Sequence, residues 1–144
     1  SSASAQARLT MASLAFAHIN HVQVDDLEIL RQGPSYMVDT LQQIHESNPD
    51  CTLRLVVGAD NVSDFFQWEQ PLKILSLAQI LVLGRQGCSF KIPSEHSESF
   101  LLQTEFDMRM SSTEIRVMLA DKGSASDFLP PAVAEYIQAN ELYL

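Results

Sequence analysis

Residues 53–58 read Leu53-Arg54-Leu55-Val56-Val57-Gly58, a short apolar run that is rich in β-branched residues and ends on a glycine. Such a run is typical of a strand buried on both faces of a parallel sheet. A second run, residues 80–83, ends in the same way at Gly84. Between them, residues 59–66 predict one or two helical turns, and residues 71–78 predict a short helix that a proline opens. Strand, helix and strand in succession predict an α/β fold whose parallel sheet is flanked by helices.

Three further elements are expected before the first strand. Residues 3–17 carry apolar side chains at loosely helical spacing, which predicts a helix. Residues 22–29 alternate around a Val-x-Val core with an acidic fringe, which predicts a strand near the edge of the sheet. Gly33 and Pro34 then break the chain, and Ser35 is expected to cap a helix with an apolar face of Val38, Leu41 and Ile44.

After the second strand, residues 86–99 are polar and predict a surface loop, and residues 103–106 predict a further strand. Ser111 and Glu114 have the spacing of a capping box, so a helix is expected to begin there and to end at Gly123. Pro130-Pro131 opens a last helix. Residues 1–144 are therefore expected to form a single domain.

Composition and charge exclude several classes of protein. The 144 residues are 46% hydrophobic, which suits a globular domain with a sizeable core. No apolar run approaches the roughly 18 residues that span a bilayer. A net charge of −9, from 18 acids and 9 bases, argues against nucleic acid or a membrane surface as partner. A small phosphorylated ligand remains compatible with this charge, because a few arginines suffice to bind one.

The chain has the features of a cytoplasmic protein. Its opening residues, 1–13, lack the charged-then-apolar order of a signal peptide. Cys51 and Cys88 have no metal-ligand spacing, so we expect two free thiols in a reducing cytosol.

Polar side chains follow the predicted strands, where open α/β sheets bind their ligands. Asp60 follows the first strand and Arg85 follows the second. Ser111, Ser112, Thr113 and Arg116 follow the strand expected near residue 106. A helix N-terminus attracts anions, the hydroxyls add donors, and an arginine one turn in can grip phosphate. An ordinary capped helix with a solvated arginine explains the same residues equally well.

Asp60 and Trp68 also have two interpretations each. The Asp60 carboxylate can accept hydrogen bonds from a ribose or cap the following turn, and Trp68 can stack on a flat heterocycle or belong to the core. His18 and His21 imitate a catalytic or metal-binding pair. They precede the predicted strand 22–29 and would lie at the opposite end of the sheet, without further ligands at metal spacing.

Five segments in chain order resemble the bacterial nicotinate-nucleotide adenylyltransferase family. They are Glu28-x-x-Arg31-x-Gly33-Pro34-Ser35-Tyr36-x-x-Asp39-Thr40-Leu41, then Val57-Gly58-Ala59-Asp60 with Phe66-x-Trp68, then Arg85-x-Gly87, then Met110-Ser111-Ser112-Thr113-Glu114-Ile115-Arg116, and the tail Leu129-Pro130-x-x-Val133-x-x-Tyr136-Ile137.

The resemblance implies a Rossmann-like nucleotidyltransferase fold and a role in NAD biosynthesis. The enzyme would transfer AMP from ATP, with Mg²⁺, to nicotinate mononucleotide, giving nicotinate adenine dinucleotide and pyrophosphate. Carried over by position, the ATP phosphates would be held by Ser111, Ser112, Thr113 and Arg116. The nucleotide and nicotinate side would be lined by Ser35, Tyr36, Gly58, Asp60, Trp68 and Arg85.

Two departures from the family pattern bear on activity. Met37 stands where the family has threonine. The family's N-terminal strand, Gly-rich turn and His-x-Gly-His motif are not among residues 1–144, and the surroundings of His18 and His21 match a different segment. No catalytic residue is therefore assigned. The chain is expected to be a fragment, a truncated form or a degenerate relative, a domain incomplete at its N-terminus and inactive alone. A nucleotide-binding module without activity and an α/β protein-interaction domain are the alternatives.

Overall fold

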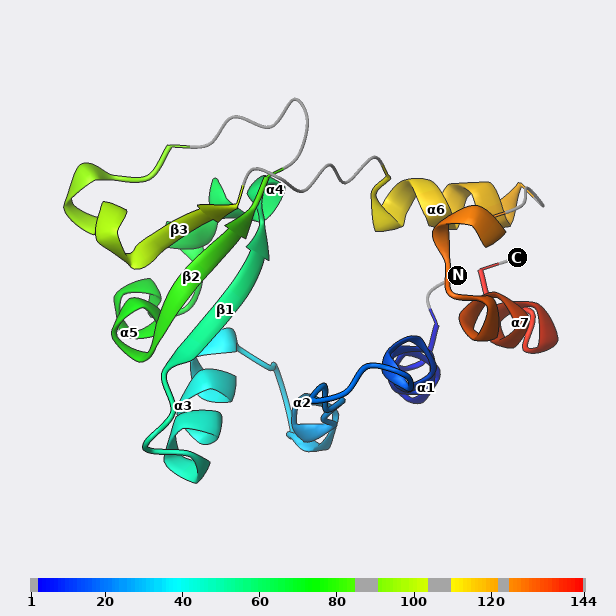
Figure 1. Cartoon of the computed structure of the whole chain (residues 1–144), viewed down its shortest axis with the longest axis horizontal. Helices are drawn as coiled ribbons and strands as arrows, with labels where there is room; N and C mark the ends of the chain where they lie inside the picture. Colours follow the sequence, from blue (N-terminus) through cyan, green and yellow to red (C-terminus); the bar gives the residue numbers. More distant parts are fainter. Residues whose placement is uncertain (1–2, 85–90, 104–109, 122–124, 144) are drawn as a thin grey trace. The chain divides into compact units, whose positions relative to one another are not determined.

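The computed structural model describes residues 3–84, 91–103, 110–121 and 125–143. Its residues form two compact units (Figure 1). Unit 1 joins Ser1–Leu30 with Met110–Leu144, and unit 2 is the continuous segment Arg31–Arg109. Unit 2 contains the sheet, and unit 1 is helical. The single domain expected over residues 1–144 stays a prediction.

The sheet of unit 2 has three parallel strands in the order β1-β2-β3. They are β1 (Leu53–Gly58), β2 (Ala78–Leu83) and β3 (Phe100–Gln103). The connections carry helices, as parallel pairing requires. These are α3 (Met37–Ser47) before β1, then α4 (Ala59–Val62), η1 (Phe65–Gln67) and α5 (Pro71–Leu77) before β2, and η2 (Ser94–Ser99) before β3. The predicted parallel α/β sheet flanked by helices is confirmed.

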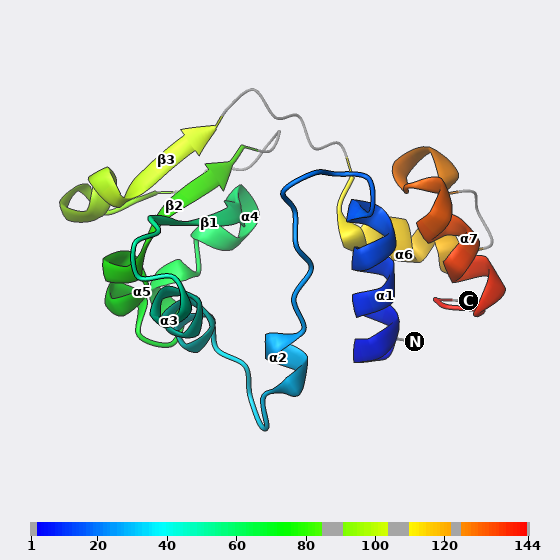
Figure 2. The same ribbon diagram turned by 60° about the horizontal axis from the view of Figure 1, so that its bottom comes forward.

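The core of unit 2 lies on one face of this sheet. Ile80 and Val82 of β2 are fully buried, and they are in register with Leu55 and Val57 of β1. The helices α3 and α5 contact each other, and Figure 2 shows both on the same side of the strands. They contribute the buried side chains Val38, Leu41 and Ile74. The prediction that β1 is buried on both faces is wrong for this structure, because Arg54 and Val56, which point to the opposite face, are exposed.

The third strand begins three residues before its predicted position. The structure forms it at Phe100–Gln103 instead of 103–106, and residues 104–106 lie outside the described part of the chain. Phe100 fixes the position, because its ring is buried 5.4 Å from that of Phe65 while its backbone is in register with Ile80. In the predicted loop 86–99, residues 86–90 lie outside the described part, and the last six residues form the 3₁₀ helix η2.

Unit 1 has helices α1 (Ala5–Phe16), α2 (Leu27–Leu30), α6 (Ser112–Ala120) and α7 (Pro131–Ala139), with the 3₁₀ turn η3 (Ser126–Phe128) between the last two. The Oγ of Ser4 caps α1 by accepting from the backbone N–H of Ala7 at 3.1 Å. Helices α1 and α7 contact each other, and the buried side chains of the unit include Ala7, Val133 and Ile137. No helix of the described residues is long and apolar enough to cross a membrane.

The strand predicted at residues 22–29 is wrong. Residues 22–26 have no regular structure and residues 27–30 form α2. The acidic fringe explains the difference, because Asp25 Oδ1 accepts from the Leu27 N–H at 2.9 Å and the Asp26 carbonyl accepts from the next turn. Local side-chain-to-backbone bonding of this kind competes with strand pairing. The prediction that His18 and His21 lie at the opposite end of the sheet depended on that strand, so it no longer holds.

Candidate functional site

The carboxyl ends of the three strands meet at one edge of the sheet. Gly58 is in register with Leu83, and the N–H of Gly84 donates to the carbonyl of Gln103 at 2.9 Å. Asp60 follows β1 directly, as the sequence predicted, and its side chain is exposed. Arg85, predicted at the end of β2, lies outside the described residues. This edge therefore carries at least one exposed carboxylate.

Gly58 and Asp60 form the turn between β1 and α4. Gly58 is the N-cap of α4, with φ −68° and ψ 147°, and Asp60 lies in the first turn of that helix. The N-cap alternative for Asp60 is thus filled by Gly58. A Cβ on Gly58 would lie 2.5 Å from Oδ1 of Asp60, closer than real Cβ contacts allow. The missing side chain leaves room for the carboxylate to lie against the end of the strand.

Trp68 is shared between the core and the surface. It is half-buried, packs against the core cluster, and its ring lies 5.2 Å from the fully buried ring of Phe65. The core interpretation therefore accounts for one side of the indole. The exposed part remains free for a ligand, so stacking on a heterocycle stays a prediction.

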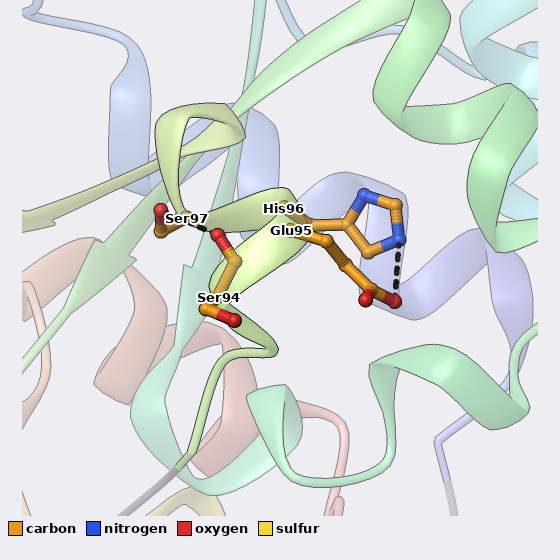
Figure 3. A network of polar contacts seen from close by, with 4 residues as sticks. All are labelled: Ser94, Glu95, His96 and Ser97. Atoms are coloured by element: carbon orange, nitrogen blue, oxygen red, sulfur yellow. Dashed lines mark hydrogen bonds and ion pairs between the residues drawn. The ribbon is translucent and has the colours of Figure 1, made fainter.

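His96 is a partly buried histidine close to the aromatic cluster of unit 2. It is half-buried in η2, and its ring stacks on Phe66 at 5.5 Å with an interplanar angle of 29°. Its Nε2 lies 3.7 Å from Glu95 Oε1, and the Ser97 Oγ donates to the Ser94 carbonyl at 2.9 Å. Figure 3 shows both contacts as dashed lines. Phe66 and His96 are 30 positions apart in sequence, and no local pattern announces their contact.

The Ser35–Tyr36 turn leads into α3 and differs from the prediction. Tyr36, not Ser35, is the N-cap of α3, and it has no side-chain cap hydrogen bond. The helix begins one residue too late for Ser35 to cap it, and the Ser35 Oγ accepts from Arg31 Nη1 at 2.7 Å instead. Tyr36 is 46% exposed. Met37, where the family has threonine, packs against the core.

In unit 1 the helix α6 begins with the predicted capping box, which is confirmed. Ser111 Oγ accepts from the Glu114 N–H at 3.1 Å, and Glu114 Oε2 accepts from both the N–H and the hydroxyl of Ser111 at 2.6 Å. Ser111 is therefore engaged in the cap. Ser112 and Thr113 of the same turn are exposed.

Arg116 and Thr113 form a pair one turn into α6. Arg116 Nη2 donates to Thr113 Oγ1 at 3.1 Å, which leaves the threonine O–H as a donor for another group. Both residues line a shallow hollow of about 250 Å³, together with Val117, Ala120 and Tyr143. The arrangement offers a guanidinium, a hydroxyl and an aromatic ring to a ligand of modest size.

The site residues thus fall into separate groups in the described structure. Gly58 touches Asp60, and Ser35 adjoins Tyr36, all within unit 2. The residues of the α6 N-terminus belong to unit 1. No group of three or more His, Cys, Asp or Glu side chains that could hold a metal ion occurs in the part of the chain described.

The parallel sheet flanked by helices defines a protein of the α/β class. The family model described as cytidylyltransferase-like matches residues 1–118. Similar proteins of known sequence indicate which branch of that family the chain resembles. A probable nicotinate-nucleotide adenylyltransferase of Gemmatimonas aurantiaca is 36% identical over 146 residues, with 97% of this chain and 69% of that protein covered. One of Albidiferax ferrireducens with the same name is 36% identical over 141 residues, covering 94% and 71%.

The chain therefore belongs to the cytidylyltransferase-like family and, within it, to the nicotinate-nucleotide adenylyltransferases. Solved structures agree on the fold. The Plasmodium falciparum nicotinic acid mononucleotide adenylyltransferase complexed with APC superimposes with a TM-score of 0.71 at 20% identity, over 96% of this chain and 75% of that one. Its complex with NaAD gives 0.72, over 96% and 73%. The Rossmann-like nucleotidyltransferase fold is confirmed.

Proposed function

We propose that this chain belongs to an enzyme that transfers AMP from MgATP to nicotinate mononucleotide, yielding nicotinate adenine dinucleotide and pyrophosphate in NAD biosynthesis. Membership of the nicotinate-nucleotide adenylyltransferases supports the reaction. The structural observation that carries it is the Arg116–Thr113 pair at the N-terminus of α6, within hydrogen-bond distance and exposed to solvent. Cys51 is a free, exposed thiol, which is the usual state in the cytoplasm that we propose for the enzyme.

The α6 N-terminus is suited to ATP phosphates. A phosphate oxygen of nicotinate mononucleotide attacks the α-phosphorus of ATP, the bond from that phosphorus to the bridging oxygen breaks, and pyrophosphate leaves. Negative charge accumulates on the phosphate oxygens during this step, so fixed positive charge and N–H dipoles lower the barrier. Arg116 supplies the charge, and Ser112, Thr113 and the first N–H groups of α6 supply dipoles. Ser111 acts by holding the start of the helix through its cap.

Mg²⁺ enters with ATP in this proposal. This ion keeps several waters and is usually bound by one or two carboxylates together with substrate phosphates, so it needs no dedicated cage of side chains. The described residues contain no such cage. The exposed carboxylate of Asp60 at the end of β1 is an acceptor of the required kind.

The second subsite, which receives nicotinate mononucleotide, is proposed at the carboxyl edge of the sheet. Asp60 accepts from a ribose or ring substituent, Gly58 lets the ligand and the carboxylate approach, and the exposed part of Trp68 stacks on the heterocycle. The Ser35–Tyr36 turn contributes a hydroxyl and an exposed phenol. Arg85 is proposed to assist there as a second cation.

The competing function is that of a nucleotide-binding module, which binds both nucleotides but does not catalyse dinucleotide formation. The same pair of Arg116 and Thr113 would serve it. Turnover and binding separate the two. We expect the full-length protein, given ATP, Mg²⁺ and nicotinate mononucleotide, to form dinucleotide and pyrophosphate in equal amounts. Calorimetric binding of both nucleotides without any dinucleotide would establish the binding module instead.

A further inference from the structure

The guanidinium of Arg31 joins three side chains at the start of α3. Nη1 donates to Ser35 Oγ at 2.7 Å and to Thr40 Oγ1 at 3.1 Å, and Nη2 donates to Gln43 Oε1 at 3.1 Å. Each of these nitrogens carries two hydrogens, so all three acceptors can be served at once. One arginine thus connects the residue just before the N-cap of α3 with two residues on the helix itself.

The helix side of this network is fixed. Thr40 is only 8% exposed, and Gln43 lies three residues further on the same face of α3. The neighbouring Val38 and Leu41 belong to the buried core cluster, at 1% and 5% exposure. Arg31 is therefore bound to a part of the molecule that cannot move without opening the core.

A short loop joins Arg31 to the start of α3. It runs from Arg31 to Ser35 and contains Gly33 at φ +87°, a left-handed conformation that other residues rarely adopt. After it, the Tyr36 carbonyl accepts from the N–H groups of Asp39 and Thr40 at 3.1 and 3.3 Å. The bond from Arg31 to Ser35 is a side-chain link between the two ends of this loop.

We propose that Arg31 is a positioning residue for the nicotinate mononucleotide subsite. By fixing Ser35, its guanidinium holds the Ser35–Tyr36 turn in the conformation that receives this substrate. The inference rests on the proposed function, in which that turn lines the subsite. Arg31 itself acts through Ser35 and α3 and not on the reacting phosphates.

Arginine is required here for its geometry. Its two terminal nitrogens reach acceptors on different sides of a planar group, whereas the ammonium of lysine is a single point. Lysine at position 31 keeps the charge but cannot hold Ser35, Thr40 and Gln43 together. The conservative substitution should therefore separate geometry from charge.

The test compares Arg31→Lys with Arg8→Lys in the full-length protein. Arg8 Nη1 also donates at 2.7 Å, to the Ala3 carbonyl, and lies outside the proposed site. For Arg31→Lys we expect the KM for nicotinate mononucleotide to rise about tenfold, with the KM for ATP and kcat within about twofold of the native values. Hydrogen exchange in the ligand-free protein should quicken at Asp39 and Thr40, whose N–H groups donate to the Tyr36 carbonyl, and stay unchanged in β1 and β2. Arg8→Lys should alter none of these.

A second pair of variants tests whether Arg31 acts through its hydrogen bond to α3. Gln43→Ala removes one acceptor of Arg31 and should raise the same KM by a smaller factor. The adjacent Gln42→Ala, whose side chain bonds Glu46 and Lys73 but not Arg31, should leave this KM unchanged. Native KM and native exchange at Asp39 and Thr40 in Arg31→Lys would overturn the inference. An equal loss for both substrates with a general fall in Tm would also overturn it, since that describes a merely structural residue. If the native protein forms no dinucleotide, the proposed function fails, and the exchange data still decide whether Arg31 orders the turn.

Discussion

The Oδ1 oxygen of Asp60 occupies the space that a side chain on Gly58 would need, with only 2.5 Å between that oxygen and an ideal Cβ. Gly58 ends β1 and begins α4, so the glycine and the carboxylate are placed by the same turn. The backbone of Gly58 has a φ of −68°, which any residue adopts. The requirement for glycine is therefore one of space.

Gly58→Ala should displace the Asp60 carboxylate and leave the strand in place. The clashing atom is the end of a side chain that can rotate, so we expect a loss of stability below about 1 kcal/mol. The KM for nicotinate mononucleotide should rise in Gly58→Ala, and the rise should be at least as large as the one in Asp60→Asn. Thermal unfolding and steady-state kinetics of both variants check this. A large fall in Tm with a native KM would show that the contact serves folding alone.

The strands of the core were predictable because burial leaves a local pattern. In β1 and β2 the alternate residues Leu55, Val57, Ile80 and Val82 belong to or pack against the core cluster that α3 and α5 share, which accounts for half of each apolar run. The Ser111–Glu114 cap was predictable for a similar reason, since four consecutive residues contain all its groups. The position of β3 depends on the contact between Phe100 and Phe65, which are 35 residues apart, and no sequence window contains both.

The candidate site was predictable only in part. Asp60 stands where strand ends place it, but the link from Arg31 to Ser35 requires a loop closed through the positive φ of Gly33. The expected cap by Ser35 failed because α3 starts at Met37, which packs against the core. Residues 22–29 alternate like a strand, yet Asp25 and Asp26 bond locally and begin α2.

The cap of α6 should contribute to stability as well as to the site. Ser111→Ala removes the acceptor for the Glu114 N–H and should cost about 1 kcal/mol, the usual value for an N-cap serine. Ser112→Ala, in the same turn but not the cap, is the matched control and should cost less. Chemical denaturation of the two variants measures the difference. Equal stabilities would mean that the capping box contributes nothing to folding.

Trp68 should report on nicotinate mononucleotide. Its indole is half-buried beside Phe65, so its fluorescence should change when a heterocycle covers the exposed part. Trp68→Phe keeps an aromatic ring against Phe65 but loses area, and should raise the KM for this substrate more than it lowers Tm. The measurements are a fluorescence titration and steady-state kinetics. A strong fall in Tm with native kinetics would assign Trp68 to the core.

Arg116 should contribute to ATP binding through its charge and its planar fork. Arg116→Ala should weaken ATP binding by about 1.5–3 kcal/mol, the range for hydrogen bonds to charged groups. Arg116→Lys should recover only part of this, because the ammonium cannot reproduce the fork. Isothermal calorimetry with ATP measures both. Native affinity in the two variants would remove Arg116 from the phosphate site.

Transfer of label from [α-³²P]ATP tests the central claim most directly. With the full-length protein, Mg²⁺ and nicotinate mononucleotide, we predict that ³²P appears in nicotinate adenine dinucleotide while unlabelled pyrophosphate is released. The same assay on Arg116→Ala should show a loss of transfer of at least tenfold at limiting ATP, as expected for the removal of a charge-assisted hydrogen bond. Label that stays in ATP, or that appears only in free AMP, would contradict adenylyl transfer to this acceptor.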